Sequence, residues 1–221
     1  MIELFKHIIH LDFDWLFQNY NDVVYAILFL VIFIETGLVL MPFLPGDSLL
    51  FTAGLFANSI NSITGEPYLN LWYLLVLLLI AAIAGDNINY WIGRKIGLRM
   101  LKIKFRGKNL VKQEYLTKTH SFYEKYGTKT IIMARFVPIV RTFAPFAAGI
   151  AEMNYKKFIS YDILGGILWI FSLTFAGYFL GEIPWIKNNI EKVALGIIFI
   201  SILPIIIEVV KVKMNKNKAQ V

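Results

Sequence analysis

The sequence has no cysteine and only three histidines among its 221 residues. Without cysteine, the chain can form no disulfide and perform no thiolate chemistry, and its redox compartment stays undecided. His7, His10 and His120 lie in peripheral segments, with no carboxylate or second ligand at a metal-binding spacing. Because a phosphate-binding Walker loop and a GxSxG motif are also absent, we expect no enzyme activity, no metal site and no cofactor.

Charged residues are scarce as well, at 17% of the chain, whereas 57% of the residues are hydrophobic. The mean hydropathy is +0.62, which is too apolar for an ordinary soluble domain. Several apolar stretches approach or exceed the ~20 residues that cross a bilayer. We therefore expect an all-α polytopic membrane protein, and the N-terminal residues do not resemble a cleaved signal peptide.

The net charge of +7 comes mainly from two regions. Of the 22 basic residues, 11 fall between Arg94 and Lys129 and four more follow Glu208. Basic residues beside apolar stretches follow the positive-inside rule, so we expect no nucleic-acid partner. The segment 94–129 is predicted to be a cytoplasmic amphipathic helix, and the tail 211–221 to be cytoplasmic.

The membrane domain is predicted to cover residues 23–210, after an N-terminal amphipathic segment at 1–22. Its predicted elements, in order, are a re-entrant hairpin at 23–57, transmembrane helix 71–92, the basic helix 94–129, a second re-entrant hairpin at 130–151, and transmembrane helices 158–180 and 193–210. Because 94–129 and the tail share one side and two spans already separate them, 130–151 must return to its own side. The polar loop before residue 71 then lies outside.

The two hairpins resemble each other weakly in sequence. Prolines interrupt both, Pro45 before Gly46 in the first, and Pro138 and Pro145 in the second. TAGLFA after the first proline resembles AAGIA in the second hairpin, and GRKIG at 93–97 resembles GYFLG at 177–181. We therefore expect two inverted repeats of a re-entrant hairpin plus a transmembrane helix, with one additional C-terminal transmembrane helix.

Two arginines, Arg135 and Arg141, lie within the apolar run ARFVPIVRTFAPFAAG. An arginine at the bilayer centre costs at least ~2.5–3.5 kcal/mol, so both should face a polar cavity. One interpretation is that they snorkel to the cytoplasmic interface, more easily for Arg135. The other is that their planar forks of donors form a phosphate or carboxylate site.

Two acidic residues lie in the first hairpin. Glu35, in VIFIETGLVL, is either a neutral hydrogen-bonded group or a titrating, charge-pairing one. Asp47 follows Pro-Gly, which fits an N-cap of the second half-helix and does not exclude a coupling role. With Arg135 and Arg141 these charges sum to zero, as expected if they meet. Asp86 and Asp162, nearer to span ends, are expected to position helices.

Four motifs together resemble the DedA family of bacterial inner-membrane proteins, which shares its domain with eukaryotic VTT-domain lipid scramblases. They are FIETG, LPGDSLL, GDNINYWIGRKIG and ARFVPIVRTFAPFAAG, and the resemblance runs from about residue 23 to 181. The family's acidic and arginine pairs match Glu35, Asp47, Arg135 and Arg141. Its glycine-rich span end and second re-entrant segment match Gly85, Asp86, Gly93, Arg94, Pro138, Pro145 and Gly149.

The resemblance implies a lipid transporter of the bacterial cytoplasmic membrane that moves undecaprenyl phosphate or a phospholipid. The arginine pair would hold the lipid phosphate, and the acidic pair would balance it or carry a coupled proton. The alternatives are a proton- or cation-coupled small-solute antiporter, and a scaffold that recruits partners through 94–129. A homo-oligomer is compatible with all three.

Overall fold

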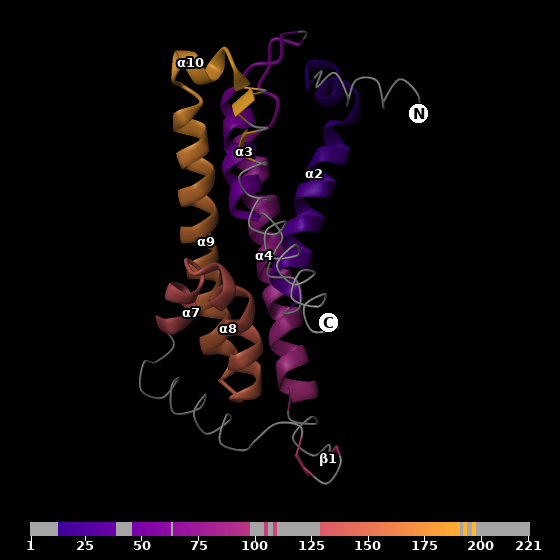
Figure 1. The fold of residues 1–221 in the computed structure, drawn as a ribbon, viewed down its shortest axis with the longest axis vertical. Coiled ribbons are helices and arrows are strands. Elements are labelled where there is room, and N and C mark those ends of the chain that lie inside the picture. Colours follow the sequence, from indigo (N-terminus) through magenta and orange to yellow (C-terminus); the bar gives the residue numbers. More distant parts are fainter. Residues whose placement is uncertain are drawn as a thin grey trace, which may run out of the picture. The chain divides into compact units, whose positions relative to one another are not determined.

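The computed structural model describes residues 13–38, 46–62, 64–97, 104–105, 108–109, 129–190, 192–193 and 196–197, and most of them are helical. The helices, labelled in Figure 1, are α2 Phe13–Gly37, α3 Gly46–Asn58, α4 Leu71–Ile92, α7 Lys129–Ala134, α8 Pro138–Ile150, α9 Tyr155–Leu180 and α10 Pro184–Lys187. Most of the predicted segments 1–22 and 193–210, and the whole tail 211–221, lie outside the described residues.

Three of these helices are long and apolar enough to cross a membrane: Phe17–Gly37, Leu71–Lys95 and Tyr155–Leu180. They confirm the predicted class of an all-α membrane protein for the described part of the chain. The bounds of α4 coincide with the prediction of 71–92. Helix α9 begins at residue 155 and not at 158, because the Asn154 side chain caps it: Oδ1 accepts the amide N–H of Lys156 at 3.0 Å.

The predicted boundary at residue 22 lies just after a kink in α2. The kink is at Tyr20 (φ −133°, ψ 26°), where two helical segments join. Just before it, Asn19 donates its Nδ2 to the carbonyl of Trp15 at 2.9 Å, and α2 continues through residue 22 to Gly37. As a result α2 alone reaches spanning length, whereas α3, with 13 residues, is only about 20 Å long.

The second predicted hairpin consists of two short helices. The helical structure is interrupted at residues 135–137, between α7 and α8. Pro138 is in the first turn of α8, where a backbone N–H would have no acceptor within the helix, so its absence costs no hydrogen bond. Pro145 was expected to bend the chain but lies inside α8, which continues to Ile150. Helix α8 also has 13 residues, too few for the ~30 Å hydrocarbon core.

The described parts of the predicted basic helix 94–129 are not an α-helix. Helix α4 continues into η1, a π-helical turn at Gly93–Gly97. Strands β1 (Lys104–Phe105) and β2 (Lys108–Asn109) then pair antiparallel, with Phe105 opposite Lys108. The sequence between them includes Gly107, a residue type that two-residue hairpin loops favour. Most of the remaining segment lies outside the described residues.

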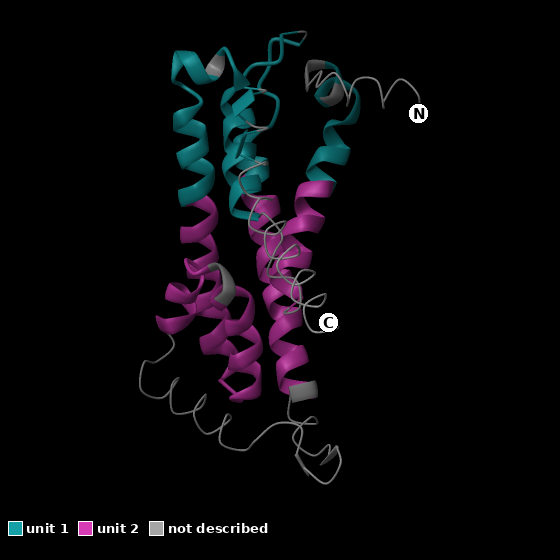
Figure 2. Cartoon of the chain, viewed as in Figure 1, with its two compact units in different colours: residues 1–26, 45–74, 172–221 teal, residues 27–44, 75–171 magenta. Residues whose placement is uncertain are grey.

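The chain divides into two compact units, coloured separately in Figure 2. Unit 1 comprises residues 1–26, 45–74 and 172–221, and unit 2 comprises residues 27–44 and 75–171. Each unit contains one of the two 13-residue helices, α3 in unit 1 and α8 in unit 2.

In unit 1, α3 and α9 cross at a pair of glycines. A Cβ at Gly54 would collide with the carbonyl of Thr174 and lie 3.0 Å from the amide of Tyr178. A Cβ at Gly177 would collide in turn with the carbonyl of Phe51. Each glycine therefore meets the backbone three residues before its partner glycine, and only glycine permits this closeness.

In unit 2, α8 crosses the end of α4 in the same way. A Cβ at Gly149 would collide with the carbonyl of Tyr90 and lie 2.8 Å from the amide of Arg94. A Cβ at Gly93 would collide with the carbonyl of Phe146. The offsets match those of unit 1, since the contacted residues again lie three before, and for Gly149 also one after, the partner glycine.

Candidate functional site

The candidate site is a group of five buried charged side chains in unit 2. Their exposed fractions are at most 4%, although each belongs to a residue type that is almost never fully buried without a partner. The five are Glu35 of α2, Asp86 of α4, Arg135 between α7 and α8, Arg141 of α8 and Asp162 of α9. Because buried charges need partners, their pairing decides what the site can do.

Arg141 is paired with Glu35. Its Nη2 donates a hydrogen bond to Oε1 of Glu35, and the two side chains form an ion pair. The Cζ atom of Arg141 also lies 4.4 Å from the ring centroid of Trp169, a buried residue of α9. A guanidinium at this distance from an indole face is held by a cation–π interaction as well as by the carboxylate.

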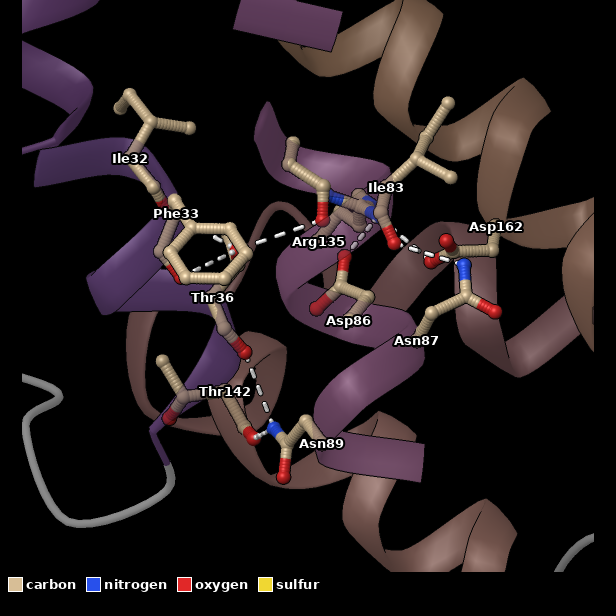
Figure 3. Close-up of polar contacts among 11 residues, drawn as sticks. Ile32, Phe33, Thr36, Ile83, Asp86, Asn87, Asn89, Arg135, Thr142 and Asp162 are labelled. Atoms are coloured by element: carbon tan, nitrogen blue, oxygen red, sulfur yellow. Dashed lines mark hydrogen bonds and ion pairs between the residues drawn. The ribbon is translucent and has the colours of Figure 1, made fainter. Parts of the chain in front are cut away.

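Arg135 is paired with two carboxylates (Figure 3). Its Nη2 donates to Oδ2 of Asp86 and, at 2.6 Å, to Oδ1 of Asp162. Arg135 lies in the non-helical residues between α7 and α8, so the axis of neither helix fixes the direction of its side chain. Gly165 of α9 leaves room for it, because a Cβ there would lie 3.4 Å from Cδ of Arg135.

Asn89 of α4 holds the two chain segments that carry the Arg141–Glu35 pair. Its Nδ2 donates to the carbonyl of Thr36 at 3.1 Å and to the carbonyl of Thr142 at 2.7 Å, as Figure 3 shows. Thr36 directly follows Glu35, and Thr142 directly follows Arg141. One buried amide therefore fixes the separation of the backbones that present the acid and the base.

A second contact brings α2 against α4. The Thr36 hydroxyl lies within hydrogen-bonding distance of the carbonyls of Ile32 (3.0 Å) and Ala82 (3.3 Å). A Cβ at Gly85 would collide with this hydroxyl and lie 2.7 Å from the carbonyl of Phe33. Gly85, which the sequence singled out, thus allows the close packing that brings Glu35 into the site.

Arg94, another residue singled out from the sequence, lies at the end of α4 and is not among the five buried charges. Its Nη1 donates to the hydroxyl of Tyr90 at 2.8 Å, and that hydroxyl donates to the carbonyl of Met153 at 2.5 Å. The Tyr90 ring stacks on Phe158 with centroids 4.5 Å apart. This set joins the end of α4 to the start of α9.

The remaining predicted residues belong to unit 1. Gly46 and Asp47 are the first two residues of α3, and Pro45 lies outside the described residues. Asp47, the residue predicted to be the N-cap, is the second residue of α3 and lies in its first turn, where a carboxylate interacts favourably with the helix dipole.

The five buried charges of unit 2 are three carboxylates and two guanidinium groups, with a formal sum of −1. One expectation about the arginines needs correction. Snorkelling of Arg135 to the interface is excluded, because the side chain is 3% exposed and bonded to two buried aspartates.

Asp86 and Asp162 were expected only to position helices, and Asn89 and Trp169 were not among the predicted site residues. The two aspartates carried a usable signal, since each lies in an apolar stretch with no capping role. Asn89 and Trp169 carried none, because a neutral amide or indole within a membrane helix is unremarkable without its partners.

The VTT-domain family matches residues 44–179, and a protein named DedA from Escherichia coli strain K12 is 49% identical over 218 residues, 98% of this chain and 96% of that protein. The chain belongs to the DedA family of VTT-domain membrane proteins. Among further DedA relatives, an uncharacterized membrane protein of Mycobacterium leprae is 46% identical over 177 residues, 80% of this chain and 75% of that protein.

A more distant relative is the inner membrane protein YqjA of Escherichia coli strain K12, 32% identical over 160 residues, 72% of this chain and 69% of that protein. No solved structure matches the chain. The VTT match includes the two arginines and the two aspartates of the site, and it begins after Glu35.

Proposed function

We propose that this DedA-family protein moves an anionic lipid, undecaprenyl phosphate or a phospholipid, across the bacterial cytoplasmic membrane, without a chemical step. The observation that carries the proposal is Arg141, a buried guanidinium in a membrane protein that is bonded to the carboxylate of Glu35. Guanidinium groups bind phosphate through two parallel hydrogen bonds. The resemblance to the family provides the lipid class.

The two arginines have different roles in this proposal. At Arg141 the lipid phosphate takes the place of the Glu35 carboxylate. Arg135 is bound by two carboxylates from different helices, Asp86 and Asp162. The proposal therefore assigns the phosphate to Arg141 and assigns Arg135 to holding α4 and α9 together, whereas the sequence made both arginines candidates for the phosphate site, with snorkelling easier for Arg135.

Transport would proceed by exchange of partners at Arg141. The lipid phosphate replaces the Glu35 carboxylate on the guanidinium, and Glu35 returns when the lipid leaves, so that Arg141 is never buried without an anion. The face of the Arg141 guanidinium rests on Trp169, which leaves the N–H groups at its edges for hydrogen bonding.

The proposal includes the inverted repeats expected from the sequence. Two observations support them: α3 and α8 both have 13 residues, and the glycine crossings in the two units have the same offsets. Transporters with inverted repeats bind their substrate where broken helices meet. In this proposal the C-terminal tail is cytoplasmic.

The experiment compares Arg141→Lys with Arg135→Lys in liposomes that contain labelled undecaprenyl phosphate or labelled phospholipids. Lysine keeps the charge but loses the bidentate geometry. Since a charge-assisted hydrogen bond contributes about 1.5–3 kcal/mol, we expect Arg141→Lys to slow lipid transport about tenfold or more. Arg135→Lys should mainly lower the melting temperature. Transport at the wild-type rate by folded Arg141→Lys would contradict a phosphate ligand at this position.

The alternative is a proton- or cation-coupled small-solute antiporter, in which Glu35 binds the ion and Arg141 only balances its charge. A pH-sensitive dye inside the same liposomes separates the two proposals. Lipid movement by the wild type without a solute-dependent dye signal supports the lipid transporter. A solute-dependent signal that Glu35→Gln abolishes, with no lipid movement, supports the antiporter.

A further inference from the structure

The Asp86–Arg135–Asp162 cluster carries one negative charge too many. Two carboxylates share one guanidinium group, and their exposed fractions are 1%, 0% and 3% for Asp86, Asp162 and Arg135. The neighbouring Glu35–Arg141 pair is neutral by itself and does not supply the missing positive charge. A net charge in a buried, apolar site is strongly unfavourable.

The hydrogen bonding of the cluster is incomplete in the same place. One oxygen of each aspartate, Oδ2 of Asp86 and Oδ1 of Asp162, accepts from Nη2 of Arg135. The other oxygens, Oδ1 of Asp86 and Oδ2 of Asp162, are buried and have no hydrogen-bond partner within the described residues. Nη1 of Arg135 is a buried donor without a partner among the described residues as well. The cluster is thus not short of donors, but it has two unpartnered acceptors and lacks a positive charge.

We infer that the Asp86–Arg135–Asp162 cluster is a proton-binding site that holds one proton on an outer aspartate oxygen. Binding takes H⁺ from water, forms one O–H bond and changes the charge of the cluster from −1 to 0, and release returns the proton to water. A proton supplies the missing positive charge. A metal cation requires more ligands, since Ca²⁺ and Mg²⁺ take six or more oxygens, and no group of three or more acidic, histidine or cysteine residues suited to a metal occurs within the described ranges.

The charged groups around the site come from every helix that contributes to it. Arg135, Asp162 of α9 and Arg141 of α8 act electrostatically on Asp86 of α4. Glu35 of α2 is bonded to Arg141. With one proton these five groups sum to zero. The inference concerns the folded protein at rest and does not depend on lipid transport.

Infrared spectroscopy tests the inference on the full chain in dodecyl maltoside, a detergent without carbonyl groups. The protein carries ¹³C at the side-chain carboxyl of aspartate, and a carboxylic-acid band is identified by its shift in D₂O. We expect this band at neutral pH in the wild type and in Asp22→Asn, a control at an exposed aspartate. It should be lost in Asp86→Asn and in Asp162→Asn. Absence of the band in the wild type, or its persistence in both cluster variants, would overturn the inference.

Melting temperatures provide a second test that follows from the charge count. Each single substitution, Asp86→Asn or Asp162→Asn, mimics the protonated cluster and should change the melting temperature little. The double variant leaves Arg135 buried without a carboxylate and should melt much lower than either single variant. If each single variant loses as much stability as the double one, both aspartates are required as anions and the inference fails.

Discussion

The Asn89 side chain joins the chain segments that carry Glu35 and Arg141, because its Nδ2 donates to the carbonyls of Thr36 and Thr142, the residues that follow them. An amide can donate two hydrogen bonds from one nitrogen, and here both are used on carbonyls of different helices. The distance between acid and base is therefore set by a neutral group outside the pair. It can be altered without changing any charge.

We predict that Asn89→Leu destabilises the protein by about 1–3 kcal/mol for each buried carbonyl that loses its donor. The measurement is thermal unfolding in detergent, together with lipid transport by the folded fraction. Asn87→Leu is the matched control on the same helix, because Asn87 donates only to Ile83 of its own helix and accepts from the exposed Tyr155. Equal losses in the two variants would show that Asn89 has no special role.

At the level of single residues, the sequence indicated which charged side chains lie within apolar segments, but it did not indicate which of them pair. Glu35, Arg135 and Arg141 could be found because a charge within an apolar run is costly. Their pairing could not be found, because Arg135 is 49 residues from Asp86, and Arg141 is 106 residues from Glu35. Whether residues so far apart in the sequence meet in space depends on how the helices cross.

The helix crossings depend on glycine. At Gly54, Gly177, Gly93 and Gly149 an added Cβ would meet backbone atoms of the facing helix, which cannot move aside as a side chain can. The two crossings use the same offsets although they join different helices, α3 with α9 and α8 with α4. Each 13-residue helix is therefore positioned by close backbone contact with the helix that it crosses.

We predict that Gly177→Ala and Gly93→Ala each destabilise the protein, by about 1–3 kcal/mol or more, since overpacking a tight contact forces the backbones apart. Gly93→Ala should also impair transport per folded molecule, because α8 carries Arg141. Gly196→Ala is the control, since a Cβ there has no neighbour within 4 Å. The measurements are melting temperature and lipid transport. A melting temperature unchanged in Gly93→Ala would disprove the tight crossing of α8 and α4.

Helix bounds could be predicted where apolar composition determines them, but not where side-chain hydrogen bonds or packing determine them. Helix α4 could be bounded because most of its residues are apolar, although Asp86, Asn87 and Asn89 lie within it. Helix α2 continues before residue 23 through a kink at Tyr20, which the sequence did not indicate. Pro145 was expected to bend α8, but the loss of one N–H does not end a helix that is packed along its length.

For the whole molecule, the proposed inverted repeats predict a definite topology. A reporter at Ser62, in the loop before α4, should lie outside the cell, and a reporter at Val221 inside. Glu152, at the end of α8, should also report inside, because the segment 130–151 returns to its own side in this topology. Accessibility of introduced single cysteines to an impermeant thiol reagent measures all three, and the native chain has no cysteine to interfere. Labelling at residue 152 from outside would rule out the inverted topology.

The order of the buried charges along the chain has a consequence for how the protein is made. During synthesis, α2 with Glu35 and α4 with Asp86 reach the membrane before Arg135 and Arg141 have been translated. The insertion machinery must therefore accept two helices whose acidic groups do not yet have their arginine partners. Asp162 follows later still, 27 residues after Arg135.

Until that point the first half of the chain is an incomplete product. It lacks Arg135 and Arg141, the guanidinium groups that pair with its acids in the folded protein. Only a chain translated past Arg141 can therefore bury both early acids with these partners.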